Sequence, residues 1–224
     1  MKFLTVSAVP TVSWSYSHPL NFRPRLVTLI FLVIGLVIFG LGEALLIAAQ
    51  VGVSPWTVLA QGISSKTDLS IGMATFLISI FILIFWVPLK QIPGIGTILN
   101  AIIIASAIDL TLGFIPKPEL ISLKILQASF GILIVGIGSG IYLASNLGPG
   151  PRDGLMIGLQ QKTNTSIPLI RTIIEITAVT VGWFLGGIVG IGTILFVFGI
   201  GPCVGVGLTL VEKVSKKRIN KLEK

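Results

Sequence analysis

Cysteine and histidine are almost absent from the sequence. The chain has one cysteine, Cys203, and one histidine, His18, among 224 residues. One cysteine excludes an internal disulfide, and the two residues are too few for a histidine-based triad or a Cys/His metal cluster. The GxGxxG and GxxxxGK phosphate loops and the HExxH zinc motif are also missing. These absences predict no metal, no cofactor and no catalytic site, although enzyme chemistry based on Asp and Ser stays open.

Charged residues are scarce as well. Asp, Glu, Lys and Arg make up 11% of the chain, whereas a soluble domain has roughly a quarter. Hydrophobic residues make up 53%, and the mean hydropathy is +1.00. The net charge of +8 comes from basic residues at the chain ends and between apolar segments. This distribution indicates an integral membrane protein that meets lipid surfaces, and it argues against binding of nucleic acid.

Six apolar segments are long enough to cross a bilayer, which takes about 20 residues. They cover residues 26–49, 71–89, 94–115, 123–145, 169–188 and 190–211. Residues 1–25 precede them as an N-terminal tail, and residues 212–224 follow as a basic tail. The sequence therefore predicts an all-α membrane protein with six transmembrane helices.

Two further stretches begin with glycine and proline and are too short to span. Ser54 before Pro55, and Gly150 before Pro151, each provide a favourable helix start, since proline is well tolerated at the first helical position. We expect short helices over residues 55–63 and 151–160 that do not cross the membrane.

The two halves of the chain are copies of each other. An offset of 96 residues aligns them without a gap, so that GIGTIL at 94–99 reappears at 190–195. Repeat 1 covers residues 26–115 and repeat 2 covers residues 116–211. Each repeat has three spans and one short helix, and this odd number would insert the second copy upside down, as in many secondary transporters.

Basic residues support this orientation. With both termini in the cytoplasm, the inner segments hold thirteen basic residues and the outer segments hold three, which are Lys66, Lys117 and Lys124. That bias obeys the positive-inside rule. Reporters near Ser64 and Gln160 are therefore expected on opposite sides of the membrane.

Candidate binding residues cluster at the starts of the two short helices. Arg152 and Asp153 take the places of Trp56 and Thr57 at the offset of 96. A helix N-terminus beside an arginine suits a carboxylate or another anion, unless these residues only shape two surface turns. The candidate substrate-binding residues are Ser54, Pro55, Trp56, Gly148, Pro151, Arg152 and Asp153.

Polar residues within the spans are functional candidates by default, because they are costly in lipid. The sequence has Glu43, Asn100, Asp109, Arg171 and Glu175 at such positions. Arg171 and Glu175 are four residues apart and are expected to pair on one helix face. Asp109 and Glu43 each lie toward the end of a span, where a side chain can reach water.

Four segments carry a family resemblance: GVSPWTVLAQGIS, PGIGTILNA, GIYLASNLGPGPRDGLM and GGIVGIGTILF. They resemble the YczE/YyaS/YitT-like family of bacterial membrane proteins over roughly residues 33–206. The resemblance implies the bacterial cytoplasmic (inner) membrane and, for some relatives, small-molecule export. An apolar residue is usual in the family at position 43, so Glu43 is not expected to be a shared functional group.

The first functional hypothesis is a small-molecule transporter or exporter with a central site between inverted halves. The second is a non-transporting membrane factor that supports another enzyme or assembly, and the third is a membrane enzyme. Six spans in 224 residues enclose little space, so a homodimer is a further expectation.

Overall fold

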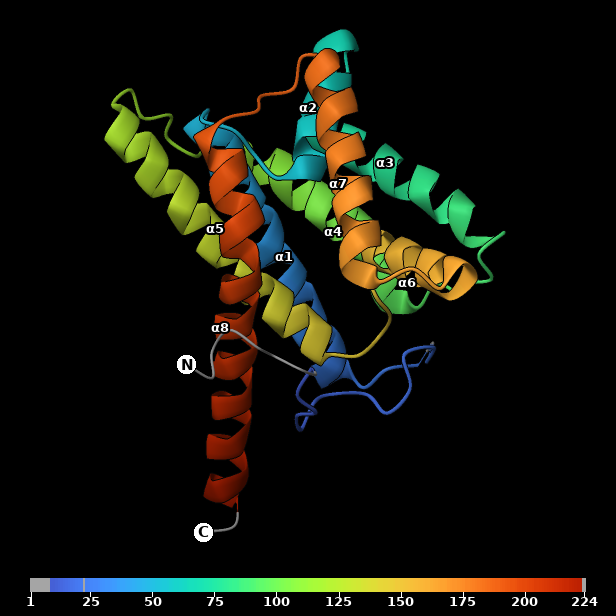
Figure 1. Cartoon of the computed structure of the whole chain (residues 1–224). Coiled ribbons are helices and arrows are strands. Elements are labelled where there is room, and N and C mark those ends of the chain that lie inside the picture. The colour runs from blue at the N-terminus through green and yellow to red at the C-terminus, as the bar shows by residue number, and fades with distance from the viewer. Residues whose placement is uncertain (1–8, 22, 223–224) are drawn as a thin grey trace.

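The computed structural model describes residues 9–21 and 23–222 of the chain, with side chains up to residue 215. Eight α helices and no strand occur in this part of the chain (Figure 1). They are α1 (Leu26–Ala49), α2 (Pro55–Lys66), α3 (Ile71–Trp86), α4 (Ile95–Leu112), α5 (Ile121–Ala144), α6 (Pro151–Thr163), α7 (Ile167–Phe184) and α8 (Ile191–Leu222).

Five helices are long and apolar enough to cross a membrane: α1, α4, α5, α7 and the Ile191–Ser215 part of α8. Helix α3 has 16 residues and passes the same test only together with α2, from which it is bent by 116°. The expected span over 71–89 therefore ends early, because turns occupy residues 87–90 and Lys90 takes a positive φ of 54°. The fold thus offers five to six candidate spans where the sequence predicted six.

The short helices α2 and α6 begin at the expected prolines and run three residues further than predicted. At the C-terminus, α8 continues through Leu222, so most of the predicted basic tail prolongs the last helix. Residues 223–224 lie outside the described part of the chain.

The described part of the predicted N-terminal tail packs against the helices. Trp14 is 3% exposed and stacks on Phe31 with ring centroids 4.2 Å apart. The Thr28 hydroxyl donates to the Trp14 carbonyl at 2.7 Å, and the Tyr16 amide donates to the Ser145 carbonyl at 3.2 Å. These bonds fix the segment to α1 and to the end of α5. Residues 1–8 and 22 of the predicted tail lie outside the described residues.

Helices α1 and α5 form the centre of the fold and run antiparallel (Figure 1). Gly35 lies against Gly138, and Gly42 lies against Gly131 and Val135. A Cβ atom on Gly42 would come within 2.6 Å of the Val135 amide nitrogen. Small residues thus allow the two backbones to approach closely, as is common between membrane helices.

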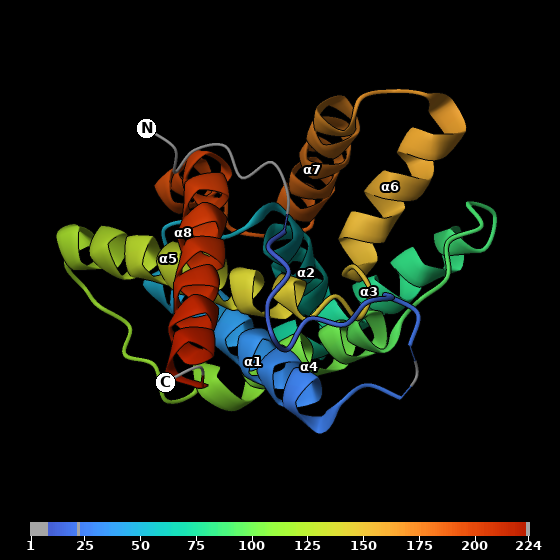
Figure 2. The same ribbon diagram turned by 90° about the horizontal axis from the view of Figure 1, so that it is seen from below.

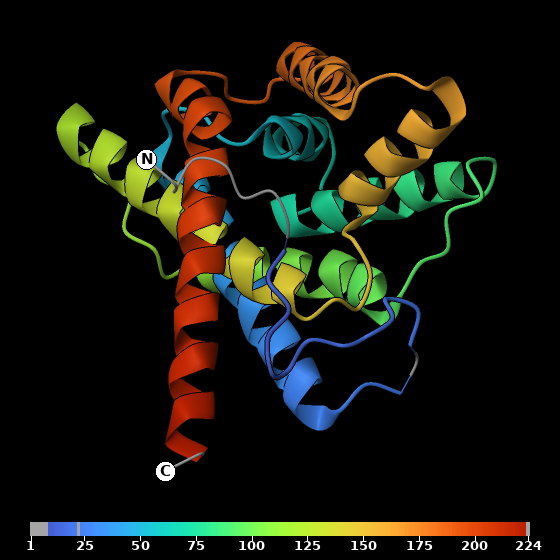
Figure 3. The ribbon, with the colours of Figure 1, turned by 60° about the horizontal axis from the view of Figure 1, so that its bottom comes forward.

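Most of the remaining helix contacts come in equivalent pairs. Helix α1 packs against α4 as α5 packs against α8, and α2 packs against α7 as α6 packs against α3. Corresponding helices start 96 residues apart to within one residue. Each short helix therefore lies against a helix of the other half, and Figures 2 and 3 show α2 beside α7 and α6 beside α3.

The loops before α2 and α6 are bound in the same exchanged way. The Gly192 amide at the start of α8 donates to the Val51 carbonyl at 2.7 Å. The Gly96 amide at the start of α4 donates to the Leu147 carbonyl at 2.8 Å. The loop of each half is thus held by the last helix of the other half, and this fixes where α2 and α6 begin.

Glycine is required in both loops. Gly52 and Gly148 have φ angles of 104° and 110°, which side chains on L-residues rarely tolerate. A Cβ on Gly52 would lie 2.6 Å from the Gly190 amide nitrogen, and one on Gly148 would lie 2.9 Å from the Thr97 hydroxyl. The equivalence of the two sites extends to their close contacts.

Candidate functional site

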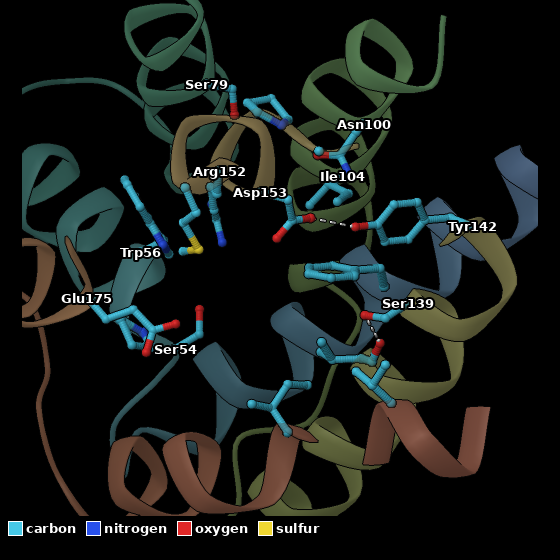
Figure 4. Close-up of a pocket in the computed structure, with 18 of the residues that line it drawn as sticks. Ser54, Trp56, Ser79, Asn100, Ile104, Ser139, Tyr142, Arg152, Asp153 and Glu175 are labelled. Atoms are coloured by element: carbon cyan, nitrogen blue, oxygen red, sulfur yellow. Dashed lines mark hydrogen bonds between the residues drawn. The ribbon is translucent and has the colours of Figure 1, made fainter. Parts of the chain in front are cut away.

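A cavity of about 210 Å³ lies where the two short helices begin. All eight helices contribute residues to its lining, which mixes apolar side chains such as Phe39 and Ile104 with polar ones. The charged groups that line it are Arg152, Asp153, Arg171 and Glu175. Figure 4 shows Arg152, Asp153 and Glu175 around this space, with Tyr142 and Asn100 on the opposite side. Apolar walls combined with converging polar groups are typical of small-molecule sites.

The N-termini of α2 and α6 both open onto this cavity. Ser54 and Gly150 are the N-cap residues, and Pro55 and Pro151 follow. The Ser54 side chain accepts no bond from its helix, and Gly150 has no side chain that could do so. The first amide groups of each helix are therefore left without a side-chain cap, and the helix dipole adds partial positive charge there.

Arg152 lies at the centre of the polar groups. Its guanidinium carbon is 5.1 Å from the centroid of the Trp56 ring, in cation–π geometry. Its side chain donates no hydrogen bond to any described residue, although it is within electrostatic range of Glu43, Asp153 and Glu175. A guanidinium has five donors, so Arg152 is held in position with its hydrogen-bonding capacity unused.

The other charged residues of the cavity have partners. The buried Tyr142 hydroxyl donates to Asp153 at 3.0 Å. Arg171 Nε donates to Glu175 Oε1 at 2.8 Å, so the expected pair is confirmed. Asn100 lies on α4 at the edge of the same cavity (Figure 4).

Asp109 and Gly148, two of the sequence candidates, lie outside the cavity lining. Asp109 is exposed and accepts bonds from the Ser70 hydroxyl and, at 2.8 Å, from the Gly72 amide. It therefore caps the start of α3. Gly148 lies in the loop before α6, where its positive φ shapes the approach of the chain. The other six candidate substrate-binding residues all line the cavity.

Sequence reasoning set Glu43 aside and did not single out Thr57. Glu43 is 2% exposed, and its Oε2 lies within hydrogen-bond distance of the hydroxyls of Ser54, at 3.0 Å, and Thr57, at 2.8 Å. The expectation that Glu43 reaches water is wrong, because the loop after α1 and the start of α2 fold back over it. An acidic residue within an apolar span was the signal that marked Glu43 as a candidate, and the family resemblance then set it aside.

The two halves distribute their carboxylates differently at equivalent positions. In the first half the carboxylate is Glu43 on α1 and the hydroxyl is Thr57 on α2. In the second half position 139 on α5 holds a serine, and Asp153 at the start of α6 holds the carboxylate. Asp153 therefore faces the cavity, whereas Glu43 is sealed behind Ser54.

Comparison with known proteins places the chain among its relatives. Residues 26–208 match the family described as "Family of unknown function (DUF6198)". The chain belongs to this family. It is 37% identical to an "Uncharacterized protein" of Haemophilus influenzae over 93% of this chain and 95% of that protein. No solved structure matches the chain.

Two relatives come from Bacillus subtilis. The "Uncharacterized membrane protein YczE" is 32% identical over 72% of this chain and 76% of its own length. The "Uncharacterized protein YyaS" is 30% identical over 83% of this chain and 95% of its own length. The expected YczE-like family is thus confirmed. Together with the apolar helices, it makes the chain a multi-pass bacterial membrane protein in contact with lipid.

Proposed function

We propose that this DUF6198 member is a membrane transporter that binds a small molecule with a carboxylate or another anionic group in the central cavity. The observation that carries the proposal is Arg152, whose donors are unused although it lines a cavity formed by all eight helices. Charge-assisted bonds from an arginine to a carboxylate are strong and geometrically specific. A cavity of about 210 Å³ suits a small metabolite.

The proposed architecture has six spans in two inverted halves. The equivalent helices α1 and α5 run antiparallel, and every major contact of one half has a counterpart in the other except those between α3 and α4. These relationships support a two-fold axis perpendicular to α1 and α5. If both helices span the membrane, that axis lies in the membrane plane, as in transporters with inverted repeats.

The central position of the proposed site follows from the same symmetry. Trp56 and Arg152 are equivalent residues, and they contact each other. Two equivalent residues that touch must lie next to the axis that relates the halves. Rocking of one half against the other would then expose the site alternately to the two sides.

The proposed location is the bacterial cytoplasmic membrane, with both termini in the cytoplasm. The support for the orientation is the excess of basic residues in the segments assigned to the inside, thirteen against three. The short connections between helices leave little soluble surface for a partner enzyme, which favours transport over a role as a supporting factor.

The test is solute flux in vesicles that contain the purified protein. A panel of labelled carboxylates, amino acids and inorganic phosphate is offered to wild type, R152Q, R152K and K162Q. Lys162 is an exposed residue near the end of the same helix, so K162Q removes one positive charge away from the cavity. R152Q should weaken binding of the carried solute by about 10- to 150-fold, since a hydrogen bond to a charged group contributes about 1.5–3 kcal/mol.

R152K should keep part of this binding, and K162Q should behave as wild type. Equal loss in R152Q and K162Q would contradict a specific site at Arg152. Folded wild-type protein that carries no solute of the panel would contradict the transporter and favour the non-transporting factor.

A further inference from the structure

Glu43 forms a closed triangle of oxygen contacts with two hydroxyl groups. Its Oε2 lies 3.0 Å from Ser54 Oγ and 2.8 Å from Thr57 Oγ1, and these two hydroxyls are 2.8 Å apart. Each of the three contacts requires one proton, and each hydroxyl can donate only one. Two hydroxyls thus satisfy two contacts, and a proton on the carboxyl group satisfies the third.

We infer that Glu43 is a proton-binding site of this protein and holds a proton in the conformation described here. In the resulting ring Glu43 donates to Ser54, Ser54 donates to Thr57, and Thr57 donates to Glu43. Three donors then match three acceptors without a gap.

The second carboxyl oxygen points to the same state. Glu43 Oε1 is buried and has no hydrogen-bond partner among the described residues. Burying an unpaired charged oxygen is far more costly than burying an unpaired neutral one. The neutral acid is therefore the form that this environment accommodates.

Few charges face Glu43. Among the described residues, Arg152 is the charged group within electrostatic range of Glu43. The helices that pack against α1 carry Asp109 on α4 and, on α5, Lys124 and Tyr142, and none of these contributes appreciably at Glu43. The protonation state of Glu43 therefore affects the electrostatic potential at Arg152, the residue proposed to hold the anion.

The charge balance of the cavity links the two sites, a step that rests on the proposed function. Arg152 and Arg171 are balanced by Asp153 and Glu175 in the cavity wall, so the region is neutral only while Glu43 is protonated. A bound anion adds one negative charge, and an ionised Glu43 would add a second. Protonation of Glu43 and anion binding at Arg152 therefore favour each other, and the effect is reciprocal.

Ser54 connects the buried acid with the cavity. It lines the cavity and is bonded to Glu43 at the same time. Glu43 can pass its proton to Ser54 Oγ while the hydroxyl proton of Ser54 moves to water that enters the cavity. The charge left on Glu43 is then the one that disfavours a bound anion, so proton and anion leave together.

Infrared difference spectroscopy of the full protein in lipid nanodiscs tests the proton site without any solute. Wild type at neutral pH should show a protonated-carboxyl stretching band that shifts in heavy water. E43Q should lose this band, and D153N should keep it. S54A should keep the band but slow its exchange with heavy water, because the connection to the cavity is removed.

A band that is identical in wild type and E43Q would overturn the site. If E43Q fails to fold, the position of the band in T57V is the test. Loss of one hydrogen bond must shift the band of a protonated Glu43, so an unshifted band overturns the inference. The band needs no solute, so a negative flux panel leaves this result standing, and an absent band leaves anion transport standing.

The coupling has its own readout in vesicles. An inward proton gradient should drive accumulation of a panel anion by wild type and should have no such effect in E43Q. Equal accumulation with and without the gradient in wild type would overturn the coupling.

Discussion

The guanidinium carbon of Arg152 lies 5.1 Å from the ring centroid of Trp56, and these residues occupy the same position in the two halves of the chain. The duplicated sequence has thus diverged where the halves meet, into a cation on one side and an aromatic face on the other. The aromatic ring holds the cation without using its hydrogen-bond donors, which leaves them for a ligand.

Replacement of Trp56 should weaken anion binding through Arg152. W56L removes the ring face, and a cation–π contact contributes about 0.5–2 kcal/mol. We therefore expect roughly 2- to 30-fold weaker binding in W56L. W56F retains an aromatic face and should stay close to wild type. The measurement is the concentration dependence of flux for the carried anion. A W56F variant as impaired as W56L would contradict the cation–π contact as the reason why Trp56 is needed.

The duplication supplies a matched pair of threonines for a stability test. Both threonines accept the amide of the glycine three residues earlier, at 3.2 Å for Thr97 and 3.4 Å for Thr193. Thr97 Oγ1 in addition donates to the Pro149 carbonyl at 2.7 Å. T97V leaves a carbonyl without its donor and should lower the free energy of unfolding by about 1–3 kcal/mol. T193V should cost less than about 1 kcal/mol. Detergent-induced unfolding measures both, and equal losses would contradict the different roles.

Asp109 should prove structural. Its carboxylate accepts the Gly72 amide at the start of α3, and loss of a helix cap costs about 0.5–2 kcal/mol. D109A should lower stability by that amount while the affinity for the carried anion stays unchanged. Asp68 is exposed nearby, and D68A should change stability by less than about 0.5 kcal/mol. Loss of affinity in a folded D109A variant would contradict a purely structural role for Asp109.

Gly154 should tolerate no side chain. A Cβ atom there would overlap the indole ring of Trp86, whose N–H donates to the Pro151 carbonyl at 3.0 Å. G154A should destabilise the fold by about 1–3 kcal/mol through overpacking. A Cβ atom on Gly201 would meet no neighbouring group of the described residues within 4 Å, so G201A should gain about 0.5–1 kcal/mol from helix propensity. Thermal unfolding compares the two, and a neutral G154A would contradict the close contact.

The starts of the short helices were predictable from the sequence. Pro55 and Pro151 predict helix starts because the preference of proline for the first helical turn depends only on neighbouring residues. The pairing of Arg171 with Glu175 is local in the same way. The repeat also identified Arg152 as a divergent position, because that comparison needs only the offset of 96.

The environment of Glu43 was not predictable, because it depends on a fold-back of the chain. Ser54 lies eleven positions after Glu43, and only the three-dimensional path of the chain brings it over the carboxylate. The contact between Trp56 and Arg152 likewise requires the two halves to be docked. For Asp109 the sequence suggested a functional role, but its carboxylate caps the start of a neighbouring helix.

Cysteine labelling from one side of the membrane tests whether the two halves are inserted in opposite orientations. The equivalent residues Thr67 and Thr163 are exposed at the ends of α2 and α6, and C203A provides a background without cysteine. A membrane-impermeant thiol reagent added to intact cells should label T67C, whereas T163C should react only after the cells are permeabilised. Labelling of both positions from the same side would contradict the inverted arrangement and the central site that depends on it.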